Sequence, residues 1–276
     1  MSQRIRGVLA PVVTPFKADF SPDCERFIRH CQWLLSQDCG LAVFGTNSEA
    51  NSMAAEERST LLDAVVAAGI DPSRMMPGTG CCSVTETVEL TAHAVRHGCA
   101  GVLMLPPFYY KNVSEEGLYR YFSEVVQRVG DTRLKIYLYH LDAFAVRAGR
   151  AVSGFDVFVG SESFLLANMR NGGVGTISAT ANVNPAAIHK LYRQWNTAGD
   201  ADNADQQQSK LNAVREVFSS RKFPSMIAAL KQAIAIHRND PEWSRVRPPL
   251  VELTKEQAKL LAAELKAIGF AMPDIA

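Results

Sequence analysis

Apolar residues follow a regular alternation along the first half of the chain. Short continuous apolar runs begin near residues 7, 40, 74, 101 and 134. Between them lie longer segments whose apolar residues have helical spacing, such as 23–36 with Phe27, Ile28, Cys31, Leu34 and Leu35. Strands and helices that alternate every 27 to 34 residues predict parallel βαβ units.

The run from Leu134 to Leu141 is the clearest predicted strand. Its sequence, Leu-Lys-Ile-Tyr-Leu-Tyr-His-Leu, is rich in aliphatic and aromatic residues, as expected of a strand buried on both faces. Polar clusters follow the predicted strands, and this strand ends on Tyr139 and His140. In a (β/α)₈ barrel, this end of each strand forms the catalytic face.

The regular alternation of predicted strands and helices is interrupted after this strand. Only two further strands are predicted, at 155–159 and 174–178, and the residues between Asp142 and Gly154 are too few for a helix, a strand and another helix. The predicted strands therefore number seven, although a closed barrel of this type needs eight. Further helices are predicted at 184–195, 202–219, 224–237 and 254–268.

An open, doubly wound sheet is the alternative to a barrel. The first predicted strand is not followed by Gly-x-Gly-x-x-Gly, and the chain contains no GxxxxGK[ST] sequence, which weakens the nucleotide-binding alternative. We therefore predict an α/β fold, a (β/α)₈ TIM barrel with a C-terminal helical extension. The expected boundaries are 1–198 for the barrel and 199–276 for the extension.

Composition narrows the possible partners. The formal net charge is +1, so nucleic acid and membrane surfaces are not expected. We find no apolar run long enough to span a membrane and no signal-peptide pattern at the start, so we expect a cytoplasmic protein. The six cysteines contain no CxxC pair and are interpreted as reduced. His93 and His97 are four residues apart, but we interpret them as helix surface and expect no metal site.

Several loop motifs occur together in a characteristic order. They are Gly45-Thr46-Asn47-Ser48-Glu49, Gly78-Thr79-Gly80, Pro106-Pro107-Phe108-Tyr109-Tyr110, Leu138-Tyr139-His140, Gly173-Val174-Gly175-Thr176-Ile177-Ser178 and Arg247-Pro248-Pro249-Leu250. In order and spacing, this set resembles the dihydrodipicolinate synthase/N-acetylneuraminate lyase family of class I aldolases. The resemblance covers nearly the whole chain.

The resemblance implies a lyase that acts on a 2-oxo acid such as pyruvate, without a cofactor. In this family a lysine on strand six forms a Schiff base, which serves as an electron sink. By resemblance, Tyr139 transfers protons and Thr46 relays them, while Asn47 stands where the family has a carboxylate-binding threonine.

The resemblance also implies assembly from identical subunits. Tyr109 matches the tyrosine that, in the family, contributes to the active site of a neighbouring subunit, with Tyr110 as the alternative. Ile177 matches a residue that lines the site through its backbone. We therefore expect a homotetramer or homodimer.

The sequence departs from the family at the lysine. None of its ten lysines lies in the expected Gly-x-Lys segment. Lys135 is at the wrong end of the fifth strand, and Lys111, although on the correct face, is in a loop and is best interpreted as solvated. A catalytically inactive barrel with a binding or assembly role is therefore the alternative function.

Two explanations account for the missing unit. Either the protein lacks it, or the sequence joins two stretches across an omitted segment. Removing one βα unit exposes two strand edges and opens the interior, so we favour an omitted segment. Neighbouring Cα atoms are normally about 3.8 Å apart. An omitted segment predicts that one pair of consecutive residues between Tyr139 and Arg150 is much farther apart, and we expect this pair to be Leu141 and Asp142.

Overall fold

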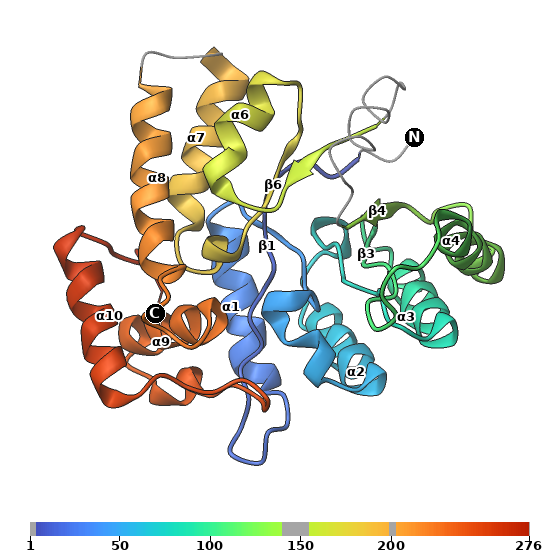
Figure 1. The fold of residues 1–276 in the computed structure, drawn as a ribbon, viewed down its shortest axis with the longest axis horizontal. Coiled ribbons are helices and arrows are strands. Elements are labelled where there is room, and N and C mark those ends of the chain that lie inside the picture. Colours follow the sequence, from blue (N-terminus) through green and yellow to red (C-terminus); the bar gives the residue numbers. More distant parts are fainter. Residues whose placement is uncertain (1–3, 140–154, 199–202, 276) are drawn as a thin grey trace.

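Strands and helices alternate along the chain in the computed structural model, which describes residues 4–139, 155–198 and 203–275 (Figure 1). The strands in these ranges are β1 Gly7–Ala10, β2 Gly40–Leu41, β3 Val102–Met104, β4 Ile136–Leu138, β5 Phe158–Val159 and β6 Gly175–Ile177. The α-helices are α1 Cys24–Ser36, α2 Ala55–Ala67, α3 Val84–Arg96, α4 Glu115–Val129, α6 Leu165–Arg170, α7 Pro185–Ala198, α8 Ala204–Phe218, α9 Met226–Arg238 and α10 Lys255–Ala267. The alternation predicted from the apolar pattern is confirmed.

The pairings between the named strands of the described residues are parallel and follow the order of a barrel. Strand β1 lies between β2 and β6, β6 pairs with β5, and β3 pairs with β4. Single parallel bridges, Leu41 to Met75 and Gly78 to Leu103, link β2 to β3 through residues 75–78. The predicted strand at 74–77 is thus present as isolated bridges rather than as a regular strand.

Among the described residues, the strand pairing is interrupted between β4 and β5. The described residues contain no strand between β4 and β5, although Tyr137 and Phe158 bring their rings to 5.9 Å across this gap. The described residues therefore contain seven strand positions, in agreement with the count from the sequence. The abnormal Cα–Cα distance predicted at Leu141 and Asp142 lies outside the described residues.

Apolar side chains pack together on the inside of the strand ring. Leu9, Ala42, Met76 and Leu103 come from four successive strand positions and form one buried cluster. A larger apolar core joins the outer faces of the strands to the helices. On the side of β1, β2 and β3 the interior is therefore a packed core, as expected of this type of barrel.

Local sequence signals fix where several helices begin. The side chains of Asp23, Ser114 and Thr254 accept hydrogen bonds from backbone N–H groups in the first turns of α1, α4 and α10. Thr254 and Gln257 form the predicted capping box. Such caps satisfy N–H groups that have no partner within the helix.

The C-terminal helices α8, α9 and α10 gather on one side of the molecule, away from α3 and α4 (Figure 1). Trp243 and Leu265 of this region belong to the large apolar core. The predicted domain boundary between residues 198 and 199 borders a segment outside the described residues. No helix of the described residues is long and apolar enough to span a membrane.

Candidate active site

A cavity of about 60 Å³ opens where the parallel strands end. It is lined by residues that follow different strands, including Thr46, Asn47, Tyr139 and Ile177. The structure thus brings together four of the five residues selected from the sequence. Parallel strands end on the same face of a barrel, which explains how residues more than 100 positions apart meet there.

Backbone contacts fix the loop that carries Thr46 and Asn47. It forms the 3₁₀ helix η1, Thr46–Ser48. The buried Thr14 hydroxyl donates to the Ser48 carbonyl over 2.8 Å, and the Ser48 hydroxyl donates to the carbonyl of Val12. These bonds join the loop after β2 to the segment after β1, so Thr46 and Asn47 are presented by an ordered backbone.

The Gly-Thr-Gly motif has a steric explanation. A methyl group on Gly78 would overlap the carbonyl of Phe44, and one on Gly80 would overlap the backbone of Leu105. Both glycines line the cavity. Glycine therefore allows three loops to approach closely enough to form it.

A buried cluster of charged residues contacts the end of the same loop. Glu49 follows η1 in a left-handed conformation, with φ of 58°. Its carboxylate accepts hydrogen bonds from the Lys231 ammonium and from the Arg247 backbone N–H, both at 2.7 Å. Lys231 and Arg247 also lie 4.6 Å from the centre of the Phe16 ring. We call Phe16, Glu49, Lys231 and Arg247 the Glu49 cluster.

The role of Lys231 was not apparent from the sequence. Its side chain is completely buried on α9, and burial lowers its pKa to about 8, against the opposing effect of the Glu49 carboxylate. A lysine with a low pKa is a candidate nucleophile. However, Lys231 does not line the cavity, and its ammonium forms an ion pair with the Glu49 carboxylate. We therefore infer that Lys231 stabilises the loop that carries Thr46 and Asn47.

The other lysines do not supply an amine to the cavity. All ten lie among the described residues, and none lines it. Lys111 is exposed and donates to the Phe108 carbonyl over 2.7 Å, as expected for a solvated loop lysine. Lys135 lines a different cavity, which lies between β4 and β5. The described structure therefore places no lysine in the cavity to replace the family's Schiff-base lysine, which the sequence lacks.

A second cavity of about 490 Å³ occupies the gap between β4 and β5. It shares Leu103, Tyr139, Gly160 and Ile177 with the first cavity. Tyr139 is held at this junction by its backbone N–H, which donates to the Met104 carbonyl over 3.0 Å. The place expected for strand six is therefore directly beside the predicted catalytic tyrosine.

Tyr109 is not part of either cavity. Its side chain is 75% exposed, that of Tyr110 is 72% exposed, and the two rings meet edge to face at 5.5 Å. Both follow β3 in the loop before α4. Tyr109 is therefore the one selected residue that lies outside the cavity of this chain.

Glu162, which follows β5, has a structural role. It is 1% exposed and pairs with Arg215 at 3.0 Å. The hydroxyls of Ser178 and Thr180 also donate to its carboxylate. Glu162 does not line the first cavity, so these contacts give it a structural role.

Comparison with known proteins places this geometry in a family. The model of the dihydrodipicolinate synthetase family matches residues 4–147 and 143–268. The two matches meet where the predicted alternation of strands and helices is interrupted. A 4-hydroxy-tetrahydrodipicolinate synthase from Thermus thermophilus is 30% identical over 299 positions, which cover 96% of each protein. An uncharacterized DapA-like lyase from Chloroflexus aurantiacus is 26% identical and covers 95% of this chain and 97% of its own.

Both alignments extend over 299 positions, although this chain has 276 residues. The relatives therefore contain residues without a counterpart here. Among solved structures, the dihydrodipicolinate synthase of Agrobacterium tumefaciens has a TM-score of 0.80 at 27% identity, covering 96% of this chain and 99% of that one.

A second solved structure, the Sulfolobus solfataricus 2-keto-3-deoxygluconate aldolase variant, has a TM-score of 0.84 at 20% identity. It covers 95% of this chain and 96% of its own. These likenesses confirm the predicted TIM-barrel fold. The family match and the relatives together show that this chain belongs to the dihydrodipicolinate synthetase family.

Proposed function

We propose that this protein is a lyase that acts on a 2-oxo acid such as pyruvate through a lysine Schiff base, as a dihydrodipicolinate synthase does. The observation that carries the proposal is the cavity at the strand ends, where Thr46, Asn47, Tyr139 and Ile177 meet. Membership of a lyase family supports it.

Three of these residues have a chemical task in the proposal. The Asn47 amide donates a hydrogen bond to the substrate carboxylate. The lysine amine attacks the 2-oxo carbon, and the carbonyl oxygen leaves as water after accepting protons. Tyr139 transfers these protons and Thr46 relays them. The protonated imine then accepts the electron pair of the adjacent bond as that bond breaks.

The lysine itself is proposed to lie in the omitted strand-six segment. None of the ten lysines lines the cavity. The gap between β4 and β5 lies beside Tyr139, and its cavity of 490 Å³ provides space for additional residues. The proposal therefore predicts that the active protein contains a strand with a lysine at this position.

Reductive trapping tests the proposal. The chain of 276 residues and a version with the strand-six segment of the Thermus thermophilus relative inserted after Leu141 are each treated with pyruvate and borohydride. Intact mass is then measured. We expect one stable pyruvyl group on the extended chain and none on the shorter one.

No adduct on either chain would contradict the proposal and favour the inactive binding or assembly role. A matched version with the inserted lysine changed to methionine controls for nonspecific reductive labelling. Turnover of a panel of 2-keto-3-deoxy sugar acids then identifies the second substrate.

We further propose a cytoplasmic homodimer or homotetramer in which Tyr109 reaches the neighbouring site. The exposure of Tyr109 and Tyr110 supports the interface, and the six free cysteines fit a reducing compartment. One dihydrodipicolinate synthase variant of this fold is described as monomeric, so the oligomeric state needs direct measurement. Sedimentation velocity that shows only monomer would contradict the proposed assembly.

A further inference from the structure

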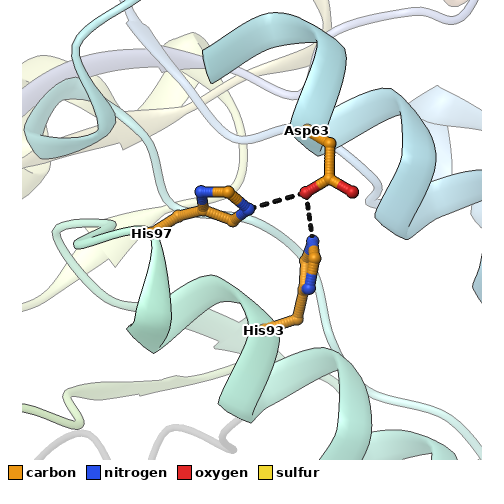
Figure 2. A group of neighbouring side chains, drawn as sticks. All are labelled: Asp63, His93 and His97. Carbon is orange, nitrogen blue, oxygen red and sulfur yellow. Dashed lines mark hydrogen bonds and ion pairs between the residues drawn. The ribbon is translucent and has the colours of Figure 1, made fainter. Parts of the chain in front are cut away.

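Three side chains that bind metals in other proteins converge on the outer surface of the barrel. Figure 2 shows Asp63 on α2 facing His93 and His97, which belong to α3 and its C-terminal end. The same Asp63 oxygen, Oδ1, lies 2.8 Å from His93 Nε2 and 2.6 Å from His97 Nε2. One ligand atom from each residue lies within 4.8 Å of the other two.

The arrangement is set by the helices. Two histidines four residues apart lie on the same face of a helix, and the packing of α2 beside α3 brings Asp63 opposite them. The Asp63 side chain is 53% exposed, whereas those of His93 and His97 are 18% and 27% exposed. An ion can therefore reach the group from solvent while the imidazoles stay ordered.

We propose that Asp63, His93 and His97 bind one divalent transition metal ion, with Zn²⁺ as the best match. Two imidazoles and a carboxylate suit zinc, and imidazole ligands are unfavourable for Mg²⁺ and Ca²⁺. Zinc bonds of about 2.0–2.1 Å in tetrahedral geometry place ligand atoms about 3.3 Å apart. The two N–O distances thus widen slightly on binding, and water takes the fourth position.

Binding also rearranges one proton. A metal ion on Nε2 of a neutral histidine leaves the proton on Nδ1. In the structure His93 Nδ1 lies 3.3 Å from Nη2 of Arg96, which also donates. Arg96 is exposed, so its side chain turns away when the metal ion binds. The cation at Arg96 opposes binding, and its removal should strengthen it.

The site has a structural role in this proposal. None of its three residues lines the cavities at the barrel centre. The ion would link α2 to α3 and thereby join two consecutive βα units. An ion that binds only the folded state raises the melting temperature as its concentration increases.

Titration calorimetry with Zn²⁺ tests the proposal on untagged, chelator-treated protein. We expect one ion per chain and a higher melting temperature with the ion. Replacing even a residue that only orients a metal ligand costs about 10- to 100-fold in affinity, so His93→Ala and His97→Ala should each weaken binding by at least about 100-fold. Co²⁺ should give the absorption spectrum of a tetrahedral site.

Two further variants sharpen the test. His189→Ala changes a histidine on α7 that faces a single carboxylate, Asp38, at 3.9 Å; it should bind Zn²⁺ like the unchanged protein. Arg96→Gln should bind it more tightly. Absence of Zn²⁺ binding to the unchanged protein would overturn the proposal. So would His93→Ala and His97→Ala variants that circular dichroism shows to be folded and that bind Zn²⁺ as tightly as the unchanged protein.

Discussion

Replacing Lys231 by methionine should destabilise the protein strongly, although methionine has a similar length and is apolar. Both Lys231 and its partner Glu49 have completely buried side chains, 2.7 Å apart. Removing one partner of a buried pair leaves an unpaired charge and costs about 3–5 kcal/mol. Domains are typically stable by only about 5–15 kcal/mol, so this is a large fraction of the total.

The double variant Lys231→Met/Glu49→Gln separates charge from packing. Glutamine keeps an acceptor for the Arg247 backbone N–H, which donates to Glu49 over 2.7 Å. Since no buried charge remains unpaired, we expect the double variant to lose less free energy of unfolding than Lys231→Met alone. Urea denaturation, monitored by circular dichroism, provides the four free energies of the cycle.

An exposed ion pair provides the control. Arg120 and Glu116 lie one helical turn apart on α4, at 2.7 Å, with side chains 77% and 63% exposed. Arg120→Met should leave the free energy of unfolding almost unchanged, because exposed pairs contribute little. A loss below about 1 kcal/mol in Lys231→Met, less than breaking a buried pair is known to cost, would refute the account of the Glu49 cluster. The account would also be refuted if the free-energy losses of Lys231→Met and Glu49→Gln simply added up in the double variant.

Three further predictions concern the cavity and the proposed interface. Gly80→Ala forces a methyl group onto the Leu105 backbone and should cost at least about 1–3 kcal/mol in thermal unfolding, whereas an unchanged melting temperature would exclude this contact. In the extended chain, Tyr139→Phe should lower turnover by about 10²–10⁴-fold with little change in melting temperature, and unchanged turnover would remove Tyr139 from the mechanism. Tyr109→Ala should weaken self-association in sedimentation experiments; equal association would place the interface elsewhere.

Local patterns predicted the fold well because they determine the elements directly. The apolar spacing in 23–36 and the caps at Asp23 and Thr254 are properties of short segments. The short helix α6, Leu165–Arg170, was missed, because six residues provide too little periodicity. Regular strand structure at 74–77 was also overestimated, since an apolar run does not reveal how many backbone bonds it forms.

The cavity residues were selected by their resemblance to the family's motifs, and they meet because parallel strand ends converge. The contacts that support them were not predicted. Lys231 meets Glu49 across 182 positions of sequence, and the only local signal was a lysine within the apolar run of α9. Likewise, His93 and His97 were visible as a pair, but their third partner, Asp63, lies on another helix. Long-range pairing depends on how elements pack, which no short pattern specifies.

The location of the reactive amine tests the central claim most directly. The extended chain is reduced with borohydride in the presence of pyruvate, digested and mapped by tandem mass spectrometry. The account predicts one modified residue, the lysine of the inserted strand, beside Tyr139 at the gap between β4 and β5. A pyruvyl group on any of the ten lysines of the present chain, Lys231 included, or no modified lysine at all, would contradict it.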